Sequence, residues 1–218
     1  MVSKAALFAN LPGVNGRLAF VLDAFRLKER ARSGWELRGI DDGESVADHS
    51  WGTALLCSMF ASEAGLDAAR TVEIALAHDL AEAEIGDVPS LANVADRPMT
   101  PSEKAQRESA AMARLEAVWP GEASARVKAR WQEYEDRASG EARFVRDMNL
   151  IDMCLMALHY ERGRIDMAPI RHAPGALDEF FESAWERIDS AFARSLLEEI
   201  EGAYREAQRM RQASITGA

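Results

Sequence analysis

The sequence predicts an all-α protein, folded as a single bundle of about seven helices in one domain that spans residues 1–218. Apolar residues recur at helical spacing along almost the whole chain, whereas alternating β-branched runs bounded by turn residues are scarce. No internal repeat, low-complexity tract or long linker divides the chain. A chain of this length buries enough surface to fold without disulfides.

Seven segments carry the helical pattern. Apolar stripes are expected in the first two, from Leu18, Val21, Leu22 and Phe25 and from Leu55, Leu56, Met59 and Phe60. The second helix starts near Ser45 or Asp48, and Asp67 is the expected N-cap of the third. The segments are 16–32, 45–65, 67–79, 100–119, 122–138, 141–163 and 176–213.

Two of these segments have clear terminal features. Thr100-Pro101-Ser102-Glu103 combines a capping threonine, a proline at the first helical position and a glutamate three residues after the threonine, which predicts a capping box. The C-terminal segment 176–213 is expected to be one long, polar helix. It would lie on the surface or pack against a second subunit, so a homodimer is predicted.

Composition limits the partners. The formal net charge of -10 repels a phosphate backbone and anionic lipids, so neither a nucleic acid polymer nor a membrane is an expected partner. A small phosphorylated substrate stays possible, because a bound divalent ion can invert the local field. The two cysteines, Cys57 and Cys154, are typical of reduced core thiols. The N-terminal segment makes a poor signal peptide, and no apolar run is long enough to span a bilayer, so we expect a cytoplasmic protein.

The most informative segment for function reads ALAHDLAEAEIGD. His78 and Asp79 are followed by Glu82, and if the helix continues, the offsets of four and three residues place all three side chains near one face. Asp87 follows Gly86, where a helix would break and a carboxylate could turn back. Imidazole and carboxylate together accept several divalent ions. Taken alone, the His-Asp pair is a weak signal and more often marks a helix end, and the acidic residues could simply be solvated.

The wider pattern resembles the HD-domain phosphohydrolases, and within them the 5'-deoxynucleotidase-like branch. The resemblance covers roughly residues 15–165. Its motifs are Gly34-Trp35, the stretch ESVADHS at 44–50, the stretch HDLAEAEIGDV at 78–88 and the stretch FVRDMNLIDM at 144–153.

The resemblance implies that His49, His78 and Asp79 bind a divalent metal ion, which could be Mn²⁺, Co²⁺, Mg²⁺, Fe²⁺ or Zn²⁺. Glu82 would be the catalytic acid or base, beside Asp79, or a ligand to a second ion. Asp87 would contact the sugar or hold that second ion, and the carbonyl of Val88 would join it. The ion would activate a water molecule and neutralise charge on the phosphoryl group.

Two positions depart from the family pattern. The fourth ligand of the family is an aspartate, and ungapped counting back from Met153 places it at Asn149, with Asp147 the alternative. These positions lie about 200° apart around a helix, so both cannot face the ion equally. Bacterial members carry a phosphate-orienting arginine where this chain has Gly34.

Other residues would then bind the substrate. Arg32 and Arg38 flank Gly34, and either could supply the guanidinium group for the phosphate. Trp35 would line the nucleoside pocket or simply pack between helices. His159 and His172 are expected to be a packing residue and a loop residue.

The favoured function is hydrolysis of a nucleoside 5'-monophosphate, preferably a deoxyribonucleotide, to nucleoside and phosphate. A nucleotide triphosphohydrolase built on the same site is the enzymatic alternative. A nucleotide-binding regulatory module with a decayed metal site is the non-enzymatic one, and Asn149 is the feature that supports it.

Overall fold

The computed structural model describes residues 13–89, 99–163, 172–173 and 175–216. Within these ranges the chain forms helices and no strand, apart from one isolated antiparallel bridge between Ala31 and Ser45. The all-α prediction is confirmed. None of the described helices is long and apolar enough to cross a bilayer. The segment 1–12, on which the prediction about a signal peptide rested, lies outside the described residues.

Most predicted helices are present. The first, expected to run to residue 32, stops at Phe25 and continues as a short 3₁₀ helix; two one-turn helices, α2 and α5, were not predicted. The helices are α1 (Gly16–Phe25), η2 (Arg26–Glu29), α2 (Ser33–Glu36), α3 (Val46–Phe60), α4 (Ala68–Ala77), α5 (Glu82–Ile85), α6 (Pro101–Val118), α7 (Glu122–Glu135), α8 (Gly140–Arg162), α9 (Asp178–Arg187) and α10 (Ala191–Thr216).

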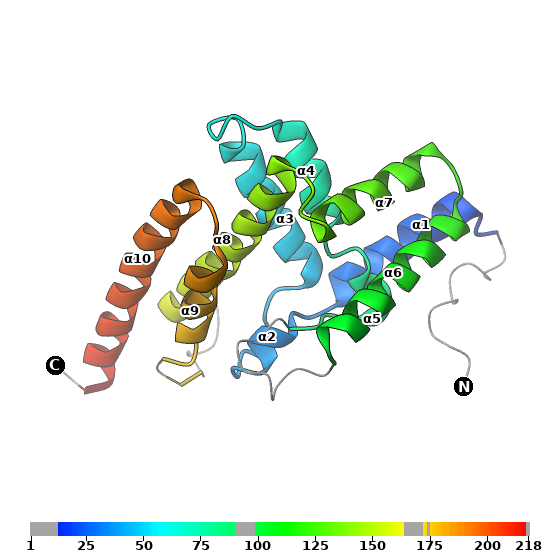
Figure 1. The fold of residues 1–218 in the computed structure, drawn as a ribbon. Coiled ribbons are helices and arrows are strands. Elements are labelled where there is room, and N and C mark those ends of the chain that lie inside the picture. Colours follow the sequence, from blue (N-terminus) through cyan, green and yellow to red (C-terminus); the bar gives the residue numbers. More distant parts are fainter. Residues whose placement is uncertain (1–12, 90–98, 164–171, 174, 217–218) are drawn as a thin grey trace.

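Helix α8 is central: it packs against α3, α4, α7, α9 and α10. Helices α1, α5 and α6 form a second group, and α7 contacts both groups (Figure 1). Each group has its own buried apolar cluster. Ile74 and Ala75 of α4 belong to the larger cluster, and Ala77, Leu80 and Ala81 belong to the smaller one. The segment around residue 78 therefore lies where the two cores meet.

The predicted capping residues start their helices. Thr100 and Glu103 form the expected capping box, and the Asp67 side chain accepts a hydrogen bond from the backbone N–H of Arg70. Ser45 caps α3 in a second capping box with Asp48. Each such cap contributes about 1 kcal/mol. The cap at Ser45 also sets where α3 begins, and so positions the residues of its first turns.

The C-terminal segment is not one helix, so that prediction is wrong. Helix α9 ends at Arg187, and α10 begins at Ala191. Both carboxylate oxygens of the buried Asp147 accept backbone hydrogen bonds from this break, one from Asp189 N–H and one from Ser190 N–H, each at 3.0 Å. The acceptors on α8 compensate for the helical hydrogen bonds that the break loses.

The first predicted apolar stripe lies largely on the surface, and the second is divided, because Leu56 is buried and Phe60 packs against the core. Leu18, Val21 and Phe25 of α1 are exposed, as are Leu55 and Met59 of α3. The face of α1 that packs inward instead presents its neighbours in the sequence, Ala19, Phe20 and Asp23.

Candidate metal centre

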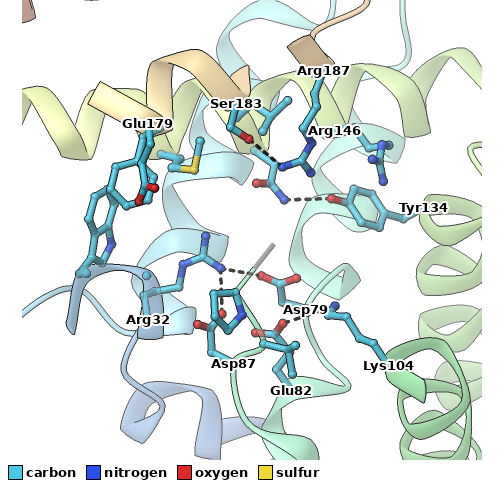
Figure 2. Close-up of a pocket in the computed structure, with 18 of the residues that line it drawn as sticks. Arg32, Asp79, Glu82, Asp87, Lys104, Tyr134, Arg146, Glu179, Ser183 and Arg187 are labelled. Atoms are coloured by element: carbon cyan, nitrogen blue, oxygen red, sulfur yellow. Dashed lines mark hydrogen bonds and ion pairs between the residues drawn. The ribbon is translucent and has the colours of Figure 1, made fainter. Parts of the chain in front are cut away.

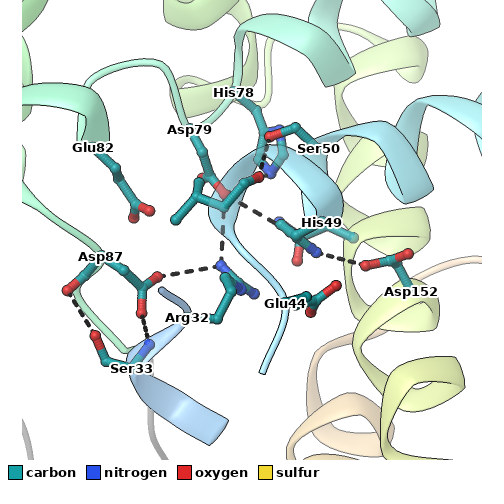
Figure 3. Close-up of polar contacts among 12 residues, drawn as sticks. Arg32, Ser33, Glu44, His49, Ser50, His78, Asp79, Glu82, Asp87 and Asp152 are labelled. Carbon is teal, nitrogen blue, oxygen red and sulfur yellow. Dashed lines mark hydrogen bonds and ion pairs between the residues drawn. The ribbon is translucent and has the colours of Figure 1, made fainter. Parts of the chain in front are cut away.

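Three side chains from two helical segments converge beside the central helix. His49 lies on α3, and His78 and Asp79 follow the end of α4 (Figure 3). One ligand atom from each lies within 4.8 Å of the others. Oδ2 of Asp79 is 3.1 Å from Nε2 of His78 and 3.7 Å from Nε2 of His49. The structure thus brings together the three residues that the sequence motif suggested as metal ligands.

Both imidazoles present a lone pair to this point. Nδ1 of His49 lies 2.6 Å from a carboxylate oxygen of Asp152, and Nδ1 of His78 lies 2.6 Å from the carbonyl oxygen of Ala75. Because each Nδ1 donates its hydrogen, each Nε2 is an acceptor. These two Nε2 atoms and Oδ2 of Asp79 are buried and have no hydrogen-bond partner within the described part of the chain. A cation satisfies three converging acceptors, and this donor set suits a divalent transition metal.

The electrostatics of the cluster favour the metal-binding protonation states of His49 and Asp79. Burial, assisted by the Arg32 charge, lowers the pKa of His49 to about 3. Burial alone would raise the pKa of Asp79, but the two imidazoles and Arg32 outweigh it and hold that pKa well below its ordinary value. Burial also disfavours a charged His78, yet the adjacent Asp79 carboxylate raises the pKa of His78 overall. A neutral His49 and an ionised Asp79 are ready to bind a cation without losing a proton.

The chain after His78 continues as a tight turn, not as the predicted continuation of the helix. Backbone hydrogen bonds run from Leu80 to Ala77 and from Glu82 to Asp79. These i to i+3 bonds still keep Glu82 on the same side as Asp79, and both line one cavity (Figure 2).

Glu82 lies in this cavity with an unusual environment. Burial, reinforced by the charges of Asp79 and Asp87, raises the pKa of Glu82 well above its ordinary value. Its Oε2 has no hydrogen-bond partner among the described residues, and Nζ of Lys104 lies 3.8 Å from its Oε1. This environment therefore favours the protonated form of Glu82.

Asp152 lies on the other side of His49, on α8. Burial raises the pKa of its carboxyl to about 7, although the charges of Arg32 and His78 oppose this rise. Asp152 does not line the cavity.

Two of the three predicted substrate-binding residues, Arg32 and Trp35, line the cavity, and Arg38 does not. Arg32 lines the cavity, where its Nη1 lies 3.6 Å from Asp79 and 3.3 Å from Asp87. Arg38 does not line the cavity; it forms an ion pair with Glu179 at the edge. The structure favours Arg32 over Arg38 as the phosphate-binding residue. Trp35 lines the cavity and is also almost fully buried, so both predicted roles for it fit.

Asp87 is already engaged by its neighbours. Its Oδ2 accepts a hydrogen bond from Ser33 N–H at 2.7 Å, and its Oδ1 faces Arg32. It therefore anchors the segment that carries Arg32, which disfavours the predicted contact with a sugar or a second ion. Val88 lines the cavity, as its predicted role requires.

The two candidates for the fourth ligand point in different directions. Asp147 does not line the cavity, because both of its oxygens bind the start of α10. The prediction that it reaches the metal is wrong in this geometry. Asn149 does line the cavity, and its Nδ2 donates to the hydroxyl of Tyr134 at 2.9 Å.

Sequence reasoning missed several residues of the site. Asp152 stood inside the FVRDMNLIDM stretch, three residues after Asn149, and that spacing was a usable signal. The cavity residues of α6, α7 and α9 carried no sequence signal for a functional site, because they belong to ordinary amphipathic helix patterns. The missed residues of the cavity include Lys104, Tyr134, Arg146, Phe180, Ser183 and Arg187.

Known proteins are similar to this chain over most of its length. The family model described as HD domain matches residues 24–186. The Homo sapiens protein named 5'-deoxynucleotidase HDDC2 is 31% identical over 189 residues, covering 87% of this chain and 86% of its own. The Saccharomyces cerevisiae protein named 5'-deoxynucleotidase YGK1 is 30% identical over 172 residues, covering 77% of each chain.

Solved structures share the fold. The PH0347 protein from Pyrococcus horikoshii OT3 superposes with a TM-score of 0.63 at 27% identity, covering 85% of this chain and 97% of that one. A structure described as a predicted metal-dependent phosphohydrolase from Magnetospirillum magnetotacticum MS-1 gives a TM-score of 0.59 at 26% identity, with coverage of 87% and 93%.

Proposed function

Because the chain belongs to the HD domain family, we propose that it is a metal-dependent phosphohydrolase that converts deoxynucleoside 5'-monophosphates to nucleoside and phosphate. The observation that carries the proposal is the group of three buried, unpartnered acceptors on His49, His78 and Asp79. Of the three residues, Asp79 lines a cavity that is also lined by the Arg32 guanidinium and the buried Glu82 carboxyl group. The preference for deoxyribose follows the names of the relatives.

His49, His78 and Asp79 hold the divalent ion, whose identity the donor set leaves open among Mn²⁺, Co²⁺, Fe²⁺ and other divalent metals. When bound, the ion supplies positive charge to the phosphoryl group and lowers the pKa of water. Asn149 is the residue of α8 that faces the cavity from the position of the family's fourth ligand.

Two residues of the chain handle the substrate phosphate and its proton. The planar Arg32 guanidinium binds two phosphate oxygens, and its bonds to Asp79 and Asp87 keep it at the cavity wall. Glu82 holds a proton on Oε2 and donates it to the 5'-oxygen of the departing nucleoside. A leaving alkoxide is a strong base, so protonation lowers the barrier to its departure.

An apolar wall accommodates the nucleoside. Trp35 packs against Phe180 with ring centroids 4.4 Å apart, and Leu150 and Met153 of α8 line the same cavity. Apolar and aromatic surfaces of this kind stack a flat base. The indole N–H of Trp35 donates to Glu44, which keeps the ring in place.

A second candidate, nucleoside triphosphate hydrolysis, is supported by one observation. Arg146 and Arg187 lie across the cavity from Asp79, Glu82 and Asp87 (Figure 2). Two guanidinium groups on the opposite wall could bind the outer phosphates of a triphosphate. Product analysis separates the two functions, since inorganic phosphate forms from a monophosphate and triphosphate forms from a nucleoside triphosphate.

The test of the main proposal combines metal content with turnover. The purified protein should hydrolyse deoxynucleoside monophosphates with Mn²⁺ or Co²⁺ and lose activity in EDTA. His78→Ala should lose both the metal and at least about 99% of the activity. His159→Ala is the matched control, because His159 is exposed, and it should keep both. Nucleotide binding without turnover under every metal would instead support a regulatory module.

A homodimer and a cytoplasmic location complete the proposal. The exposed large apolar side chains favour an interface on α1, α3 and α4, through Leu18, Val21, Phe25, Leu55, Met59 and Leu76, because the described part of α10 exposes only Met210 among such residues. Light scattering should report a dimer that Met59→Lys weakens, and a wild-type monomer would refute it. Both cysteines are buried and unpaired, as a reducing compartment favours.

A further inference from the structure

Asp152 stands behind one of the two imidazoles of the metal centre. It projects from α8 and lies on the far side of His49 from Asp79 (Figure 3). Its Oδ2 is 2.6 Å from Nδ1 of His49, and both residues are buried. Because Asp152 does not line the cavity, its contact with the site runs through His49.

The geometry decides which nitrogen of His49 carries the hydrogen. If Nε2 were protonated, it would need an acceptor, and Oδ2 of Asp79 at 3.7 Å is too far for a hydrogen bond. A hydrogen on Nδ1 has an acceptor at 2.6 Å in Asp152. The carboxylate therefore selects the form whose Nε2 lone pair points at His78 and Asp79.

The two imidazoles are fixed by different means. His78 donates from Nδ1 to the backbone carbonyl of Ala75, a contact that no side-chain substitution can remove. His49 depends on a side chain from another helix. The orientation of His49, unlike that of His78, can therefore be released by substituting a side chain outside the ligand set.

Gly52 makes the approach of Asp152 possible. It lies on α3 one turn after His49, facing α8, and a Cβ atom there would be 2.0 Å from Oδ1 of Asp152. Glycine inside a helix is destabilising relative to alanine. The close approach of the carboxylate supplies the physical reason for that glycine.

We propose that Asp152 is a positioning residue that holds His49 in its metal-binding tautomer and orientation, and that Gly52 provides the space for it. The inference rests on the proposed metal-dependent function. A carboxylate behind a metal-binding histidine typically strengthens metal affinity by 10-fold to 100-fold, about the range expected here.

A cation held by Asp152 itself is the competing arrangement. Glu44, His49 and Asp152 also offer ligand atoms within 4.8 Å of one another. Two of these groups are already paired, however: Glu44 accepts from the indole of Trp35 at 2.9 Å, and Asp152 accepts from His49. A cation there would have to displace the shortest of these bonds, so the positioning role accounts better for the geometry.

Mn²⁺ affinity, measured by electron paramagnetic resonance titration, is the first readout. Asp152→Asn should weaken Mn²⁺ binding by about tenfold and Asp152→Ala by up to about 100-fold. Gly52→Ala should resemble Asp152→Ala because it pushes the same carboxylate away. The double variant should be no weaker than Asp152→Ala, since both changes remove one interaction.

Glu161→Gln is the matched control. Glu161 is a second buried acid on α8 whose carboxylate also pairs with an imidazole, that of His172 at 2.9 Å, but it lies away from the cavity. This variant should lose stability and keep wild-type Mn²⁺ affinity. A general weakening of α8 would instead lower the affinity of both variants alike.

The second readout is the tautomer of His49, observed by ¹⁵N NMR of the metal-free protein. The wild type should carry its hydrogen on Nδ1, and Asp152→Ala should shift the population toward Nε2–H. Unchanged tautomer and unchanged affinity in the Asp152 variants would overturn the inference while leaving the proposed function intact. A wild-type protein that binds no metal would refute the proposed function, and the tautomer would still decide the role of Asp152.

Discussion

The role of Asp147 can be tested sharply, because the sequence offered it as a metal ligand and the structure assigns it to the start of α10. Asp147→Ala removes the acceptor of two backbone hydrogen bonds, from Asp189 and Ser190 at 3.0 Å each. We expect this variant to unfold more easily and to bind Mn²⁺ as the wild type does.

The magnitude follows from the two bonds. A hydrogen bond to a charged group contributes about 1.5–3 kcal/mol. Asp189 is exposed and Ser190 is partly exposed, so water replaces part of each bond and the lower end applies. The expected loss is about 3 kcal/mol, which corresponds to a drop of roughly 6–12 °C in Tm for a chain of this size. Asp147→Asn keeps one acceptor oxygen and should lose about half as much.

Urea unfolding followed by circular dichroism at 222 nm measures the stability, and calorimetric titration with Mn²⁺ measures the affinity. Asn149→Ala is the paired variant, since Asn149 lies on the same helix but faces the cavity. The reasoning is refuted if Asp147→Ala keeps its stability and loses Mn²⁺ affinity instead.

Three further outcomes are expected. Asn149→Asp adds a carboxylate at the cavity and should tighten Mn²⁺ binding by about tenfold in calorimetry, whereas an unchanged Kd would place residue 149 outside the site. Burial opposes the charge of Glu161, but its contacts with His172 and Arg211 outweigh burial and lower the pKa of Glu161. The ionised Glu161 therefore stabilises the fold above the ordinary glutamate pKa, and this stabilisation is lost as pH falls through the lower pKa of the folded state. Glu161→Gln should therefore cost about 2 kcal/mol at pH 7 in urea unfolding, with a gap that closes below about pH 4; a constant gap would contradict this. Finally, Mn²⁺ at about 100 times its Kd should stabilise the wild type by about 2.7 kcal/mol and His78→Ala not at all.

Much of the fold was predictable because its signals are local. Helical periodicity needs only neighbours three and four residues apart, and the caps at Asp67 and Thr100 bind backbone groups of their own first turn. His78 and Asp79 are adjacent in the chain. The meeting of these two with His49 was expected from a family motif, not from spacing.

Which side chains of a helix are buried or face the cavity depends on the elements that pack against that helix. The pattern of α1 identified residues that share a face, but the packing of α6 and η2 turned Leu18, Val21 and Phe25 outward. On α8, Asp147 and Asn149 both looked able to reach the metal, and only the position of the α9–α10 break decided that Asp147 faces away.

The sequence by itself determined the all-helical architecture, the helix starts and the chemical types gathered in the HD motif, since these follow from contacts a few residues apart. Tertiary structure alone decided that Asp152 meets His49, that Arg32 rather than Arg38 enters the cavity and that α9 contributes part of its wall. The physical reason is that helical periodicity defines a face of a helix but contains no information about the side chain that packs against that face from another helix.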